Sequence, residues 1–321
     1  MELDNRTGWP AALFRAPLEG DRFAAALVAR VTFQLTAAGP VPAADQPWIV
    51  SRGPWASPRG PADGDVLFRR AGVDLFLFGT AHVAGRARTE TSVQLTVGGF
   101  QRRIRVIGDR AWVRRRRGLE PTAPQPFTEM PLSLAHAYGG RAVWDQLAIP
   151  HPDNPAGRGF VLDEASAEGA VLPNLEDPAQ PIGHWSDRPD PVGLGFCPMT
   201  CGLRLRAGLL VGEGGQLRGI SPALFNAAFP AMIAERVVPG DAVRIAGVSE
   251  TGAPLAFAVP ELPLVARLRF GADVIQRPLA IDQLGIEADA QRIFVTYRYP
   301  FRYVMHPRQL RSCCLLFGEG A

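Results

Sequence analysis

The fold is decided by the stretch VQLTVGGFQRRIRV, residues 93–106, in which apolar and polar side chains alternate on both sides of two glycines. Alternation with a period of two is typical of a strand with one buried face, and a Gly-Gly pair is typical of a two-residue hairpin turn. A turn at these glycines pairs Val97 with Phe100, Leu95 with Arg102 and Val93 with Ile104. Nearly all the apolar side chains then share one face, and Arg102 is the one charged side chain on it.

Further strands are predicted on both sides of this hairpin. Runs of apolar, β-branched and aromatic residues between turn signals indicate strands at residues 23–35, 74–78, 243–247, 255–259, 264–270, 293–299 and 313–317. Between about residues 139 and 198, glycine, proline and asparagine dominate, which indicates loops of defined shape.

Two short helices are also expected. One covers residues 130–138 and ends at Gly139-Gly140, because glycine is common just past a helix end. The other covers residues 222–229, with Ser221 as N-cap. We therefore predict a mostly β protein of two packed antiparallel β-sandwich or barrel-like units, with a loop-rich centre and few short helices. The N-terminal unit, residues 1–195, includes the loops, and the C-terminal unit is 196–321; the boundary is approximate, and one continuous domain is the alternative.

All 34 basic residues are arginine, and the chain has no lysine. A Walker phosphate loop, a pyridoxal Schiff base, a kinase site and a serine-lysine hydrolase all require a lysine, so these classes are excluded. The formal net charge of +3 is close to balance, which favours neither nucleic acid nor an anionic membrane as the partner.

The start of the chain, MELDNR, has neither the basic nor the apolar region of a signal peptide. No apolar run approaches the roughly 20 residues that span a bilayer. Four cysteines in 321 residues suit a reducing compartment, so we expect a cytoplasmic protein.

Metal ligands are sparse in the sequence. Cys197 and Cys201 are too far apart for a redox pair, although His184, Cys313 and Cys314 could complete a set of four ligands. The alternative is that these cysteines are small buried apolar side chains. His151 and Asp153 form a second weak pair that a polar turn explains. We expect no metal and no cofactor, and the sequence leaves open whether the four cysteines bind metal.

Paired carboxylates at 163–164 and 176–177 raise the alternative of a carbohydrate-acting enzyme on a β-sandwich. In it, Glu176 and Asp163 would act as acid and base with His151 nearby, which requires the two carboxyl groups to lie roughly 5 to 9 Å apart. Acidic loop residues beside proline are usually solvated or bound to nearby backbone N–H groups. The sequence also lacks the common hydrolase and dinucleotide motifs, so we expect no enzyme.

The run of four arginines at 114–117 is the one concentrated charge in the chain. Such a run contacts phosphate or an acidic protein surface when it is functional, but most runs of this kind are solvated loops. Trp112, beside the run, is expected in a core.

The order of several motifs resembles the domain of unknown function 2169 family of bacterial proteins, which act as type VI secretion effector adaptors or chaperones. The resemblance covers most of the chain. Its motifs are Asn5-x-Thr7, Val31-Thr32-Phe33, Asp74 with Gly79-Thr80-Ala81, Gly108-Asp109-Arg110-Ala111-Trp112, Met130-Pro131-Leu132, Ala137-Tyr138-Gly139-Gly140, Asn154-Pro155-Ala156-Gly157-Arg158-Gly159-Phe160 and Leu172-Pro173-Asn174-Leu175-Glu176.

The resemblance implies a cytoplasmic, non-enzymatic adaptor whose partners are a toxin effector and the spike (tip) proteins of a type VI secretion system. A structural component of the injection apparatus is a further alternative. We expect the middle motifs to converge on one rigid face for partner binding, where arginine and aromatic side chains serve as anchors. The predicted partner-binding residues are Asp109, Arg110, Trp112, Tyr138, Gly139, Gly140, Asn154, Pro155, Gly157, Arg158, Gly159, Phe160, Pro173, Asn174 and Glu176.

Overall fold

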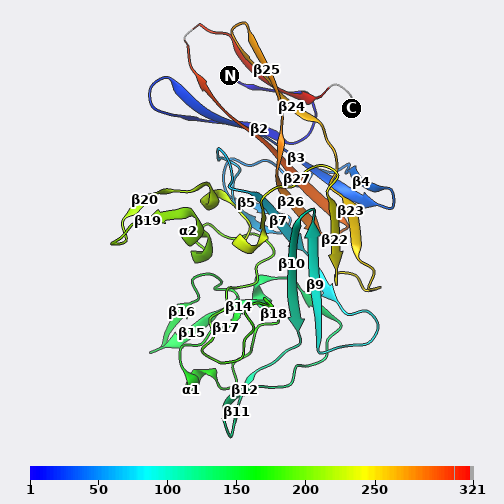
Figure 1. The fold of residues 1–321 in the computed structure, drawn as a ribbon, viewed down its shortest axis with the longest axis vertical. Helices are drawn as coiled ribbons and strands as arrows, with labels where there is room; N and C mark the ends of the chain where they lie inside the picture. The colour runs from blue at the N-terminus through cyan, green and yellow to red at the C-terminus, as the bar shows by residue number, and fades with distance from the viewer. Residues whose placement is uncertain (307, 319–321) are drawn as a thin grey trace.

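Strands dominate the structure, a computed structural model that describes residues 1–306 and 308–318. Figure 1 shows three large sheets and several two-stranded ribbons. The protein is therefore mostly β, as predicted, and no sheet in the described ranges closes into a barrel. Across the same ranges, no helix is long and apolar enough to cross a bilayer.

The predicted hairpin is confirmed in its strands and in its register. β9 (Glu90–Val97) and β10 (Phe100–Ile107) are antiparallel, and all three expected pairs are present. Arg102 is half-buried on the apolar face, where its Nη1 lies 2.9 Å from Oδ2 of Asp177. This ion pair explains how a charged side chain is tolerated there.

The hairpin belongs to a five-stranded sheet with the order β18-β10-β9-β22-β23. Its remaining strands are β18 (Leu175–Glu176), β22 (Ala242–Ala246) and β23 (Leu255–Ala258). Val93, Leu95 and Ile104 are fully buried, so one face of this sheet packs into the core.

The largest sheet has the order β2-β3-β27-β26-β7-β21, with β4 paired to β3. Its strands are β2 (Ala11–Pro17), β3 (Arg22–Thr36), β4 (Gly39–Pro42), β7 (Val73–Phe78), β21 (Ile233–Ala234), β26 (Ala280–Glu287) and β27 (Arg292–Val304). A third sheet has the order β1-β28-β24-β25, with β1 (Leu3–Asn5), β28 (Arg311–Phe317), β24 (Leu264–Phe270) and β25 (Asp273–Pro278). The seven strands predicted outside the hairpin all appear in these sheets.

The smaller elements are ribbons and single helical turns. The ribbons pair β5 (Trp55–Ser57) with β6 (Gly60–Ala62), β8 (Thr80–His82) with β13 (Glu129–Pro131), β11 (Trp112–Arg115) with β12 (Gly118–Pro121), β14 (Tyr138–Gly139) with β17 (Arg158–Gly159), β15 (Arg141–Trp144) with β16 (Leu147–Pro150), and β19 (Leu209–Val211) with β20 (Leu217–Ile220). The helical elements are α1 (Glu164–Ala167), α2 (Gly202–Gly208), and the 3₁₀ turns η1 (Leu134–His136), η2 (Pro222–Phe225) and η3 (Pro230–Met232).

The helix predicted at residues 130–138 is wrong. Met130 pairs with Ala81 in a strand, and the N–H of Leu132 donates to the carbonyl of Gly79, so the backbone bonds outward rather than within a helix. Only the single turn η1 remains. The second predicted helix is shortened to η2, but its cap is confirmed, because the Ser221 side chain accepts from the N–H of Ala223.

Each large sheet contains strands from both sides of the predicted boundary at residue 195. In the largest sheet, β27 lies between β3 and β26, and in the third sheet β1 runs parallel to β28. The division into domains between residues 195 and 196 stays a prediction. In every large sheet, main-chain hydrogen bonds join strands that precede this position to strands that follow it. One continuous hydrophobic cluster accordingly contains side chains from all three.

A buried carboxylate, Asp74, joins β7 to the neighbouring segments. It accepts from Nε of Arg70 at 2.8 Å, from Nδ2 of Asn226 at 2.8 Å and from Nε2 of Gln283 at 3.1 Å. The backbone N–H groups of Ala227 and Ala228 donate to it as well. Charge-assisted bonds from this many donors offset the cost of burying the charge.

Further ion pairs extend this network through the largest sheet. Arg30 and Asp65 are paired at 2.6 Å, with both side chains buried. Arg298 donates to Asp282 at 2.9 Å, and Nη1 of Arg70 reaches the same carboxylate at 3.4 Å. Groups on β3, β26 and β27 are thus tied to the loop that precedes β7.

Replacing Asp74 by Ala should lower the free energy of unfolding by about 3–5 kcal/mol, because it leaves the Arg70 guanidinium and two backbone N–H groups buried with one partner fewer. Urea denaturation of the two proteins measures this. The control Asp273→Ala, an exposed carboxylate on β25, should change the stability by no more than about 0.5 kcal/mol. Equal effects of the two substitutions would contradict the role given to Asp74.

Candidate functional site

The motif loops of the middle of the chain come together in the lower part of the molecule, green in Figure 1. β14 and β17 run parallel, with Tyr138 opposite Arg158 and Gly139 opposite Gly159. A parallel bridge between Ala137 and Leu175 places the motif at residues 172–176 beside them. The expected convergence of these motifs is therefore present.

Asn154 holds two of these loops together from inside. Its Nδ2 donates to the carbonyl of Leu134 at 2.8 Å and to that of Tyr138 at 3.0 Å. The backbone carbonyl of Asn154 accepts from the N–H of Gly140. The side chain is buried, with 1% of its surface exposed. Its role in the structure is to fix the shape of the loops.

The glycines around Asn154 are required by close packing. A Cβ on Gly139 would lie 2.2 Å from the carbonyl oxygen of Asn154, and one on Gly157 would lie 2.3 Å from its Nδ2. Gly139 also has φ of +142°, a conformation that residues with a side chain rarely adopt. No larger residue fits at either position without moving the backbone.

Asn174 forms a second centre. Its Nδ2 donates to the carbonyl of Ile107 and to Oδ1 of Asp109, both at 2.9 Å, and its Oδ1 accepts from Nη1 of Arg158 at 3.0 Å. Nδ1 of His136 lies 2.9 Å from the same Oδ1. Since this oxygen can only accept, Nδ1 of His136 carries the proton.

Glu176 is buried and paired with arginines. Its Oε1 accepts from Nη2 of Arg110 at 2.5 Å, and its Oε2 lies 3.5 Å from Nη1 of Arg105. Nη2 of Arg110 also donates to the carbonyl of Pro173. These contacts join β10 and β18 to the loop after β10.

The predicted partner-binding residues divide by exposure. Those that are buried or nearly so hold the loops in place: Trp112, Tyr138, Gly139, Gly140, Asn154, Pro173, Asn174 and Glu176. Asp109 and Pro155 are exposed, and Arg110, Gly157, Arg158, Gly159 and Phe160 are intermediate. Trp112 lies in a small second core with Leu119 and Leu172, as expected, so it supports a surface rather than forming one.

An open groove of about 430 Å³ lies against these loops. The predicted residues in its lining are Gly139, Gly140, Gly157, Arg158, Gly159 and Phe160. The strand β15 supplies a further side of the groove, through Arg141 and Val143. Four glycines and two arginines, Arg141 and Arg158, thus line the same open space.

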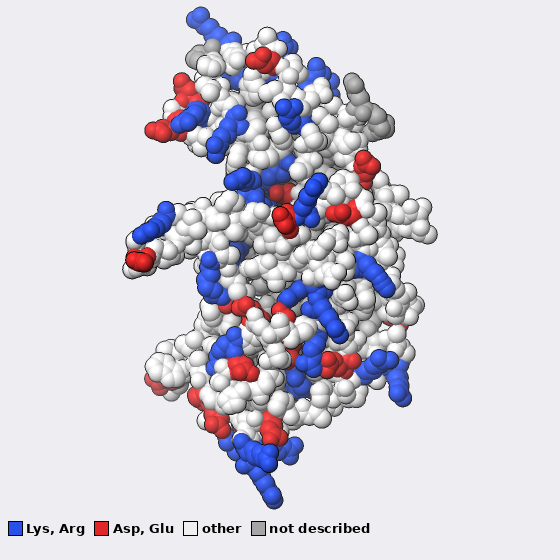
Figure 2. All heavy atoms as spheres, viewed as in Figure 1, with Lys and Arg blue, Asp and Glu red and all other residues white. Residues whose placement is uncertain are grey.

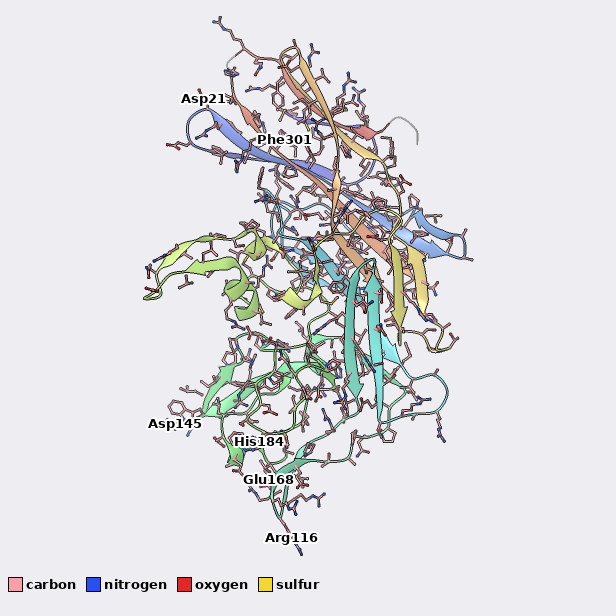
Figure 3. All side chains as sticks on the ribbon, viewed as in Figure 1. Asp21, Arg116, Asp145, Glu168, His184 and Phe301 are labelled. Atoms are coloured by element: carbon pink, nitrogen blue, oxygen red, sulfur yellow. The ribbon has the colours of Figure 1, made fainter. Side chains whose placement is uncertain are left out.

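Beside the groove, the hairpin of β15 and β16 exposes large apolar side chains that the sequence did not reveal. Val143, Trp144 and Leu147 are 64%, 62% and 60% exposed. The turn between the strands, Asp145-Gln146, has φ of +45° and +65°, as in the tight hairpin turns usually built with glycine. Figure 3 places Asp145 at the outer end of this hairpin.

The residues of the enzyme alternative have structural partners. Asp163 caps α1 by accepting from the N–H of Ser166, and this hydrogen bond lowers the pKa of Asp163. His151 is buried between Tyr138 and Phe160, with ring centroids 5.2 and 5.0 Å away. Its Nδ1 accepts from the N–H groups of Asp153 and Asn154.

The cysteines are free and buried. Cys197 and Cys201 pack with Phe229 in a small apolar cluster. Cys313 and Cys314 lie on β28, in the sheet β1-β28-β24-β25. The structure therefore does not bring the four together. Among the side chains of residues 1–306 and 308–318, no group of three or more His, Cys, Asp or Glu could hold a metal ion.

Comparison with known proteins identifies a family. The sequence model of the family described as "Uncharacterized protein conserved in bacteria (DUF2169)" matches residues 20–298. No curated protein and no solved structure matches the chain. The matched range contains every motif loop that lines the groove.

Burial lowers the pKa of His151, which gives a test of its placement. The unfolded chain then binds this proton at a higher pH than the folded chain, so the free energy of unfolding falls as the pH drops below about 6.5. His151→Gln should show a weaker pH dependence of urea denaturation over this range than the wild type. The control His184→Gln removes an exposed histidine. An unchanged slope in His151→Gln would contradict the burial of a neutral imidazole.

Proposed function

We propose that this chain, which belongs to the bacterial DUF2169 family, is a non-enzymatic cytoplasmic adaptor or chaperone. In this role it binds a toxin effector of a type VI secretion system and helps to load it onto the spike. The observation that carries the proposal is the groove beside the motif loops, together with the apolar hairpin that flanks it. A binding surface, and not a constellation of reactive groups, is what these loops support.

The composition of this surface favours a protein as the ligand. Trp144 and Leu147 are large, exposed apolar side chains at the end of the hairpin whose strand β15 lines the groove. Tryptophan and arginine are enriched among the residues that dominate protein interfaces. Apolar side chains exposed together on one hairpin are costly in water unless a partner covers them. Arg141, an exposed residue of the groove lining, adds a charged group.

The buried contacts explain how this surface would be kept ready for a partner. Asn154 and Asn174 bond the loops at several points, so that little conformational freedom remains to be lost on binding. A surface ordered in advance binds more tightly than a flexible one of the same area. The predicted motif residues thus serve binding in two ways, some as contacts and others as the framework.

The alternative of a carbohydrate-acting enzyme gains no support from the carboxylates. Glu176 is buried in ion pairs with arginines, and Asp163 is a helix cap. Neither carboxylate lines the groove, whereas a pair of glycosidase carboxylates must flank the bond that breaks.

Leu147→Ala should weaken capture of the toxin effector, because Leu147 is 60% exposed on the hairpin whose strand β15 lines the groove. We expect a loss of about ten-fold when it is combined with Trp144→Ala. The measurement is a pull-down with the tagged protein from its native cell lysate, with the bound proteins quantified by mass spectrometry. Leu310→Ala is the matched control, since Leu310 is the same residue type and equally exposed, at 60%, away from the groove.

Recovery of one toxin-like protein and a spike component by the wild type, lost in the double variant and kept in the control, is the expected result. Recovery of spike proteins alone would favour a structural component of the injection apparatus. Recovery of neither by folded wild-type protein would overturn the adaptor proposal.

A further inference from the structure

The hairpin of β11 and β12 ends in arginines that have no partner within the described parts of the chain. Arg115, Arg116 and Arg117 are all exposed and form no ion pair with residues 1–306 or 308–318. The fourth arginine of the run, Arg114, is different, because Glu164 and Glu168 each lie 3.0 Å from its guanidinium. We call Arg115–Arg117 the arginine tip.

The base of this hairpin is anchored. Trp112 is 2% exposed and packs in the second core, and its carbonyl accepts from the N–H of Gly169 at 2.8 Å. Its own N–H donates to the carbonyl of Ala170 at 3.0 Å. The arginine tip therefore projects from a fixed support, and Figure 3 places Arg116 at the far end of the molecule.

Acidic side chains lie on β12 and around α1, between the arginine tip and the rest of the molecule. Across residues 114–120 and 163–168, four arginines are matched by four acidic residues, Glu120, Asp163, Glu164 and Glu168. Figure 2 shows the basic tip with acidic side chains next to it. The positive charge is therefore confined to the outermost end.

This distribution of charge selects among anionic partners. A nucleic acid presents phosphates over a long distance and would meet the acidic residues behind the tip, where like charges repel. The one aromatic side chain of the hairpin, Trp112, is buried and offers no face for stacking a base. A short acidic protein segment, in contrast, can contact the three arginines alone.

We propose that the arginine tip is a docking site for an acidic segment of a protein partner, whose Asp or Glu carboxylates pair with the guanidinium groups of Arg115, Arg116 and Arg117. Guanidinium groups bind carboxylates through two parallel hydrogen bonds, which gives such contacts direction as well as charge. This inference goes beyond the proposed adaptor function and does not require it, because a defined acidic peptide tests the site without any toxin or spike protein.

The experiment measures fluorescence anisotropy of a labelled oligoglutamate peptide titrated with the full chain at low salt. Replacing the three tip arginines by glutamine should weaken binding by at least about ten-fold. The matched control replaces three exposed arginines of β24 and β25, Arg267, Arg269 and Arg277, by glutamine. It makes the same change in net charge at the opposite end of the molecule and should reduce binding by less than about three-fold.

Three results would overturn the proposal. The wild type could fail to bind the peptide, the tip variant could bind as well as the wild type, or a thymidine oligonucleotide of matched charge could bind more tightly and lose its affinity in the tip variant. The last result would assign the tip to nucleic acid. Thermal melting of both variants checks that they are folded, which the exposure of all six arginines leads us to expect.

Discussion

The hydrogen bonds of the buried Asp74 carboxylate are the interaction on which the arrangement of the largest sheet depends. It lies on β7, and its partners come from the preceding loop, from β26 and from the segment after η2, so parts of the chain far apart in sequence meet at one side chain. A carboxylate buried without these donors would cost several kcal/mol. The requirement to satisfy it therefore fixes where the segment 226–228 must lie, and η3 and β21 follow directly from there.

Hydrogen bonds from buried side-chain amides likewise hold the motif loops together, although Oδ1 of Asn154 and the hydroxyl of Tyr138 find no partner among the described residues. Asn154 and Asn174 replace the regular hydrogen bonding of a sheet in a region where the strands are only two residues long. This internal bonding leaves outward-facing backbone, arginine and apolar side chains free to define a surface. The amide side chains that give these loops their shape, Asn154 and Asn174, are consequently buried.

Much of the fold could be predicted from the sequence, because alternation and turn chemistry act locally. The hairpin at Gly98-Gly99 was predicted to the register, and the other predicted strands are present. The error at residues 130–138 came from tertiary contacts, since the backbone there bonds to β8 and not to itself. Of the candidate site, the convergence of the motifs was predictable. The exposure of Trp144 was not, because nothing in an apolar residue's neighbours along the chain tells which side of a short ribbon faces water.

The position of β27 between β3 and β26 has a consequence for how this protein is made. β3 is a 15-residue strand, most of it buried, and the partner on one side is synthesised more than 250 residues later, as the separation of 258 between Gln34 and Arg292 shows. During translation the largest sheet cannot form completely until β27 has left the ribosome. Pairing between such distant strands makes folding slow and leaves an apolar edge open to aggregation in the meantime. The edge of β3 that β27 covers therefore stays unpaired until that strand has been synthesised.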